Sequence, residues 1–136
     1  SGGNMFIPEF VQSEVEMLSE QECVNSIWLF GSRANGTANE ESDWDLLVFQ
    51  DKDVEYITRD SHLIDVVRVS ASGMVQTDGF KHSYPFSSWE WEFDNNESAR
   101  YIGKHFIEYK DGVRDSSSPV YKKKPCKAYC LWSKRT

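Results

Sequence analysis

A hydrophobic run that ends abruptly at Gly31-Ser32 is the feature of this sequence that most constrains its fold. Residues 24–30 have the length and composition of a buried strand, and the two small residues after them predict a tight turn before a short helix. A glycine there lets the backbone approach a ligand closely, and a helix start has unpaired N–H groups that suit phosphate. Residues 24–32 therefore predict a strand that leads into a phosphate-binding turn.

Two aspartates lie on the next predicted strand, residues 43–50, with ten residues between Ser32 and Asp43. Because residues i and i+2 of a strand share one face, Asp43 and Asp45 point the same way and Trp44 points into the core. Asp65 lies in the third predicted strand, residues 62–69, where a carboxylate among apolar neighbours is costly unless something binds it. Three oxygen donors of this kind predict a site for Mg²⁺, with Mn²⁺ as the alternative ion.

These parts predict a reaction at phosphorus. Two metal ions about 3.5–4 Å apart can clamp the attacking and leaving oxygens of an in-line displacement. With the β- and γ-phosphates at Gly31-Ser32, the α-phosphate faces the carboxylates, and attack there releases pyrophosphate. Asp43 and Asp45 are expected to bridge the two ions, and Asp65 to hold the ion at the acceptor hydroxyl and take its proton. Arg33 is either a phosphate ligand or an ordinary surface arginine after the turn.

Gly31-Ser32, the Asp43-x-Asp45 pair and the later Asp65 resemble the motifs of the DNA polymerase beta-type nucleotidyltransferase superfamily. The forms GSRANG and SDWDLLV are most similar to its minimal nucleotidyltransferases, and the resemblance covers roughly residues 8–70. It implies an α/β (α+β) fold, in which a short mixed β-sheet is flanked by helices, with two Mg²⁺ ions and an NTP donor, for which ATP is expected. Some similar minimal members are antitoxins that nucleotidylate a tyrosine or similar hydroxyl on a helical partner protein.

Two classes of function stay open. The first is an enzyme, a nucleotidyltransferase that moves an NMP to a hydroxyl on a partner protein, with a small molecule or an RNA end as variant acceptors. The second is a catalytically silent module that binds a nucleotide or a partner. The complete set of three carboxylates favours the enzyme, because a binding module has no need of a costly acidic cluster.

The remaining elements are predicted from periodicity. Residues 8–22 favour a helix, and residues 70–84 a loop or weak hairpin. In residues 86–93, aromatic and acidic residues alternate as in a strand with one covered face. The aromatic stripe of that strand, Trp89, Trp91 and Phe93, favours sheet-to-helix packing over a base-stacking platform. The spacing of apolar residues from Asn95 to Gly112 predicts a second long helix.

Residues 1–4 are interpreted as an expression-vector remnant, residues 5–112 as the nucleotidyltransferase domain and residues 113–136 as a basic aromatic tail. Residues 1–109 hold 7 Lys and Arg against 20 Asp and Glu, a net −13, whereas residues 110–136 hold 8 against 2, a net +6. An acidic body disfavours duplex DNA, and the tail is expected either to fold back on it or to contact RNA or an acidic partner. The three cysteines are expected to be reduced. Without a leader or an apolar span, we expect a cytoplasmic protein with no membrane partner.

Overall fold

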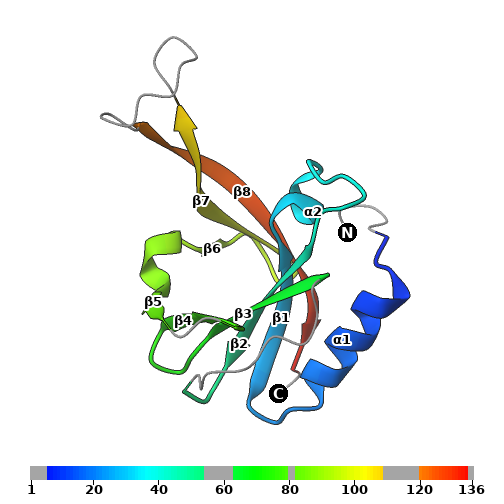
Figure 1. Ribbon diagram of the computed structural model, residues 1–136. Coiled ribbons are helices and arrows are strands. Elements are labelled where there is room, and N and C mark those ends of the chain that lie inside the picture. The colour runs from blue at the N-terminus through cyan, green and yellow to red at the C-terminus, as the bar shows by residue number, and fades with distance from the viewer. Residues whose placement is uncertain (1–5, 54–62, 80–81, 109–119, 135–136) are drawn as a thin grey trace.

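A computed structural model of the chain describes residues 6–53, 63–79, 82–108 and 120–134. Its strands form one eight-stranded sheet in the order β5-β4-β3-β2-β1-β8-β7-β6, which curls around one side of the molecule (Figure 1). The elements in chain order are α1 Glu9–Ser19, β1 Val24–Phe30, α2 Ser32–Asn35, β2 Trp44–Gln50, β3 Ile64–Val69, β4 Met74–Thr77, β5 Ser83–Pro85, the 3₁₀ helix η1 Phe86–Trp89, β6 Glu92–Phe93, β7 Ser98–Glu108 and β8 Val120–Ser133.

The sheet is mixed, as predicted, because β2 and β3 run parallel while the other neighbours run antiparallel. It is not the short sheet flanked by helices that the sequence predicted. The described part of the chain is rich in strands, and α1 is its one long helix. No helix in these described segments is long and apolar enough to cross a membrane.

The central elements follow their local sequence closely. β1 has the predicted bounds, β2 begins one residue later than predicted, and α1 begins after Pro8 and ends three residues early, at Ser19. Pro8 suits this start because its carbonyl accepts the N–H groups of Val11 and Gln12, both at 3.0 Å. Val11 and Leu18 are the buried residues of α1 and lie seven apart, on one side of the helix.

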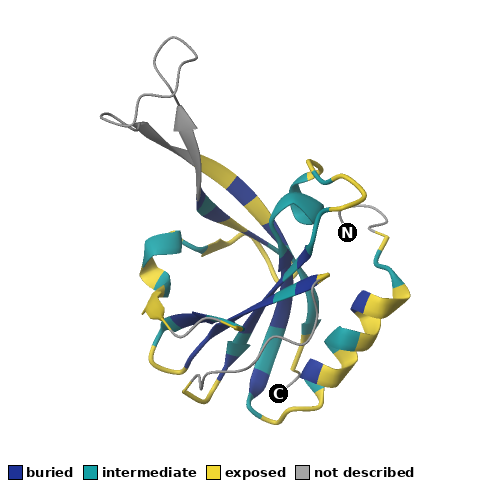
Figure 2. Cartoon of the chain, viewed as in Figure 1, coloured by how far each residue is buried: buried dark blue, intermediate teal, exposed yellow. Residues whose placement is uncertain are grey.

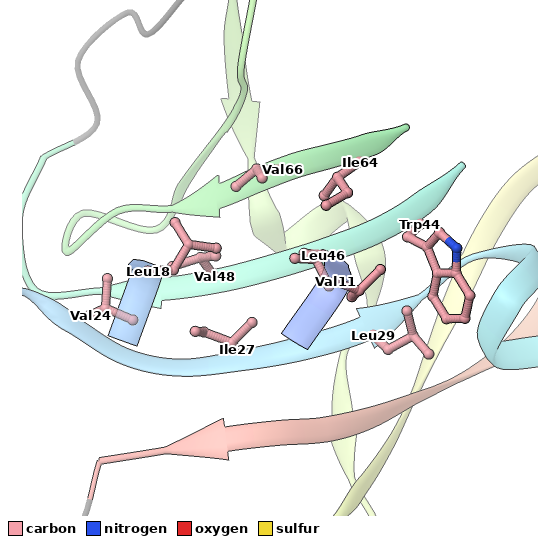
Figure 3. Close-up of a cluster of buried hydrophobic side chains, with 10 residues drawn as sticks. All are labelled: Val11, Leu18, Val24, Ile27, Leu29, Trp44, Leu46, Val48, Ile64 and Val66. Atoms are coloured by element: carbon pink, nitrogen blue, oxygen red, sulfur yellow. The ribbon is translucent and has the colours of Figure 1, made fainter. Parts of the chain in front are cut away.

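The two faces of the sheet have separate cores. The helix face packs against α1 and includes Ile27, Leu29, Trp44 and Leu46 (Figure 3). The opposite face, here called the inner face, carries Trp28 of β1, Leu47 of β2, and Val67 and Val69 of β3. Burial therefore concentrates on the central strands, while the outer side of α1 is exposed (Figure 2). Because β1 and β2 are covered on both faces, their apolar runs are nearly continuous.

Residues 70–84 contain the hairpin that the sequence left open. β4 pairs with β3 and β5 pairs with β4, both antiparallel.

The buried Arg68 of β3 forms an ion pair with Asp78 at 3.2 Å and donates to Gln50 Oε1 at 3.3 Å. These partners stabilise Arg68, because they offset the free-energy cost of removing a charged guanidinium from water.

The strand predicted over residues 86–93 is wrong. The chain instead forms η1, turns at Glu90 with φ 52°, and resumes as the two-residue strand β6. The aromatic stripe does pack, but against the sheet rather than a helix. Trp91 lies 5.3 Å from Trp28 between ring centroids, and Trp89 lies 5.2 Å from Phe30.

The helix predicted from Asn95 to Gly112 is also wrong. Residues 98–108 form β7, which pairs with β8 along most of its length. The Asn95 side chain accepts the N–H groups of Glu97 and Ser98, so it closes a turn before a strand rather than capping a helix. Gly112, like the predicted vector remnant and residues 113–119 of the predicted tail, lies outside the described residues. Residues 120–133 of that tail form β8, which lies between β1 and β7.

The two-sided burial of β2 gives a stability prediction. Leu46 is fully buried on the helix face, so Leu46→Ala is expected to lower the free energy of unfolding by about 2–5 kcal/mol in urea denaturation. The control Met17→Ala removes a similar side chain that is 60% exposed on α1, and should change that free energy by about 0.5 kcal/mol or less. Equal losses in the two variants would show that Leu46 is not a core residue.

Candidate active site

The turn after β1 depends on glycine. Gly31 has φ 75° and ψ −160°, a conformation that essentially only glycine adopts. A Cβ built on Gly31 would overlap the Oδ2 atom of Asp45, so the Gly31 backbone lies directly against that carboxylate. The Gly31 carbonyl accepts the N–H groups of Ala34 and Asn35 at 3.1 Å and so begins α2.

Strand register brings two of the three predicted carboxylates together. Asp45 of β2 is the partner of Phe30 on one side and of Asp65 on the other. Directly paired residues on neighbouring strands share a face, so both carboxylates lie on the inner face. Each is followed two residues later by a core residue of that face, Leu47 and Val67 respectively. Gly31, Asp45 and Asp65 therefore meet at one end of the sheet.

Asp43 immediately precedes β2, two residues before Asp45. Its carboxylate, with those of Asp45 and Asp65, supplies the oxygen donors that Mg²⁺ prefers. Within the described residues, no group of three or more His, Cys, Asp or Glu side chains is arranged to hold a metal ion. The structure thus supports the pairing of Asp45 with Asp65, and the three-ligand set stays a prediction.

Tyr101 of β7 is a site residue that the sequence analysis missed. Its hydroxyl accepts the Gly31 N–H at 3.0 Å, and its side chain is almost completely buried. Burial raises the pKa of Tyr101 to about 12, and the nearby Asp45 charge acts in the same direction, while the bond from Gly31 acts against them. No local signal reveals this residue, because its position depends on β7 being a strand.

Asn35, at the end of α2, links the turn to β8. Its Nδ2 donates to the carbonyls of Gly31 at 2.8 Å and Lys127 at 3.2 Å, and its Oδ1 accepts the Lys127 N–H at 2.8 Å. The Asn35 side chain thus pairs with the Lys127 backbone in β8 as a residue of a neighbouring strand would. Together, Tyr101 and Asn35 attach the Gly31 turn to both strands of the β7–β8 hairpin.

Arg33, a predicted phosphate ligand, lies against the helix face. Its guanidinium donates to the Ser42 carbonyl at 2.9 and 3.3 Å and lies 4.6 Å from the centroid of the Trp44 ring. Ser32 lines the same groove as Arg33 and Trp44. Of the predicted nucleotide-binding residues, Gly31 therefore adjoins the carboxylates, and a phosphate contact by Ser32 or Arg33 stays a prediction.

Comparison with known proteins agrees with this geometry. Residues 13–72 match the family described as Polymerase beta, Nucleotidyltransferase, a segment that runs from α1 past the end of β3. This match agrees with the resemblance that the motifs indicated, and the matched segment contains all six predicted site residues. No curated protein and no solved structure matches the chain.

The contact between Gly31 and Asp45 gives the second prediction. Gly31→Ala should lower the free energy of unfolding by about 3 kcal/mol or more, because backbone strain and displacement of Asp45 add. The control Gly36→Ala lies at the other end of α2, with φ 73° and open space around its Cβ, so it should cost only about 1–2 kcal/mol. Urea denaturation of both variants measures the difference. If Gly31→Ala costs no more than Gly36→Ala, the close contact with Asp45 is absent in solution.

The environment of Tyr101 predicts a dependence on alkaline pH. Its folded-state pKa of about 12 exceeds the ordinary value of 10.0, so its stabilising effect is complete below pH 10 and is lost as the pH rises towards 12. In a phenolate absorbance titration of the folded protein, Tyr101 should ionise near pH 12. The contribution of Tyr101 is obtained by subtracting the titration curve of Tyr101→Phe from that of the wild type. A difference that titrates near pH 10 would contradict the buried position of the hydroxyl.

Proposed function

We propose that this chain transfers an NMP from an NTP, with ATP as the donor, to a hydroxyl on a partner protein. The acceptor oxygen forms a bond to the α-phosphorus, the bond from that phosphorus to the β-bridging oxygen breaks, and pyrophosphate leaves. The acceptor's proton passes to Asp65 or to solvent. The observation that carries the proposal is the meeting of Gly31, Asp45 and Asp65 at one end of the inner face, within a nucleotidyltransferase domain.

The residues of the turn orient the donor. Gly31, whose backbone lies against the Asp45 carboxylate, donates its N–H to the Tyr101 hydroxyl. A phosphate oxygen can take this N–H only when Tyr101 releases it, so nucleotide binding replaces one hydrogen bond with a charge-assisted and stronger one. Ser32 and Arg33 complete the proposed phosphate contacts, and Arg33 would first have to leave the Ser42 carbonyl.

Asp43, Asp45 and Asp65 are the residues that would hold two Mg²⁺ ions, or Mn²⁺ in their place. Such ions polarise the α-phosphate and lower the pKa of the acceptor hydroxyl. The paired positions of Asp45 and Asp65 support this assignment, because two carboxylates on adjacent strands repel each other unless a positive charge neutralises them.

The acceptor is proposed to belong to another protein because of how the rest of the chain folds. Beyond the matched segment, the described residues add β4 to β8 to the same sheet and form no separate helical domain that would bind a substrate. We propose that a partner protein completes the acceptor site, and the earlier resemblance suggests a helical one.

Nucleotide-dependent stabilisation tests the proposed site. We expect Mg²⁺ with one NTP to raise the melting temperature by several degrees, because a ligand at a hundred times its Kd adds about 2.7 kcal/mol. Asp45→Asn should abolish the Mg²⁺-dependent part of this rise. The control Asp51→Asn should keep it, because Asp51 is exposed and lies beyond the opposite end of β2.

An equal rise in wild type and Asp45→Asn would place the nucleotide away from the carboxylates and contradict the proposal. Turnover separates an enzyme from a silent binding module. With a partner present, label from the α-phosphate should reach the acceptor and pyrophosphate should appear. Release of NDP and inorganic phosphate would show attack at the γ-phosphate instead.

A further inference from the structure

A cavity of about 440 Å³ opens on the inner face beside the Gly31 turn. Its walls include Phe30 from β1, Val67 from β3, Trp89 from η1 and Tyr101 from β7, with Tyr84 and Ser88 among its other lining residues. The volume lies within the range of about 300–1,000 Å³ that is usual for small-molecule sites. Most of these residues follow residue 72, so the match to the nucleotidyltransferase family assigns them no role.

The cavity adjoins the proposed phosphate site. Phe30 immediately precedes Gly31, and the ring of Tyr101 lines the cavity while its hydroxyl accepts the Gly31 N–H. On β3, Val67 lies two residues after Asp65 and shares its face. A molecule with its phosphates at Gly31 and the carboxylates would therefore have its other end within reach of the cavity.

The chemistry of the walls selects a flat, uncharged group. The Trp89 ring lies 5.2 Å from Phe30 and 5.4 Å from Tyr101 between centroids, so three aromatic rings meet there. Polar atoms near them already have partners: Trp89 Nε1 donates to the Tyr84 hydroxyl at 3.0 Å, and Ser88 Oγ to the Pro85 carbonyl at 2.9 Å. None of the described residues that line the cavity carries a charged side chain, so these walls suit an uncharged group better than a phosphate.

We infer that this cavity holds the nucleobase of the donor NTP, with Trp89 as a stacking wall. The inference rests on the proposed function, and it assigns a base site to residues outside the matched segment. It also gives two tryptophans of the aromatic stripe different roles. Trp89 lines the cavity, whereas Trp91 packs among Trp28, Phe49 and Phe86 and belongs to the core.

Titration calorimetry tests this site by measuring the affinity of each variant for ATP and for inorganic tripolyphosphate, both in the presence of Mg²⁺. Trp89→Ala should weaken ATP binding about tenfold, because the base loses its stacking partner, and leave tripolyphosphate binding unchanged. Ser88→Phe should weaken ATP in the same way by filling the cavity while keeping its aromatic walls. In the matched control Phe93→Ala, both affinities should stay at the wild-type value, because Phe93 is 62% exposed and does not line the cavity.

The outcomes separate this inference from the proposed function. If wild type binds ATP and both cavity variants bind it as tightly as wild type does, the base lies elsewhere and only the inference fails. It also fails if wild type binds tripolyphosphate as tightly as ATP, since the base then contributes nothing. If wild type binds neither probe, the proposed function fails and the inference fails with it. Should Trp89→Ala not fold, Ser88→Phe decides the result.

Discussion

At the end of β1, the Gly31 backbone lies so close to the Asp45 carboxylate that no side chain fits between them. This contact requires a glycine with positive φ, and it determines where the backbone turns into α2. It also holds the turn on the same face as Asp65, because Asp45 and Asp65 are register partners on adjacent strands. The proposed phosphate contacts at the turn depend on this close approach, because it places the turn beside the carboxylates.

The second half of the chain completes that arrangement. β8 inserts beside β1, and β7 carries Tyr101 to the Gly31 N–H. Asn35 bonds to the backbone of Lys127 in β8, so the turn is attached to both strands of the hairpin. The strands outside the matched nucleotidyltransferase segment thus hold its turn in place, and they also supply most of the aromatic cavity beside it.

The sequence predicted the parts whose structure depends on local pattern. β1 and β2 are buried on both faces, so their apolar runs mark their bounds, and the alternation within β2 correctly placed Trp44 in the core. The pairing of Asp45 with Asp65 needed the register of a parallel pair, which local pattern does not contain. β7 was predicted as a helix because its apolar spacing is helical. Its conformation is instead determined by pairing with β8, which is distant in sequence, and Tyr101 was missed for that reason.

The two faces of the sheet are proposed to have different roles. The helix face holds Arg33 on Trp44, whereas the inner face holds Asp45 and Asp65. A crystal structure with Mn²⁺ and a non-hydrolysable ATP analogue tests this division most directly, because Mn²⁺ is located by its anomalous scattering. The proposed function predicts Mn²⁺ at Asp45 and Asp65, with the triphosphate at Gly31 and with Arg33 moved from the Ser42 carbonyl to the phosphates. A triphosphate bound against Trp44 on the helix face, away from Gly31 and with no Mn²⁺ at the aspartates, would contradict it.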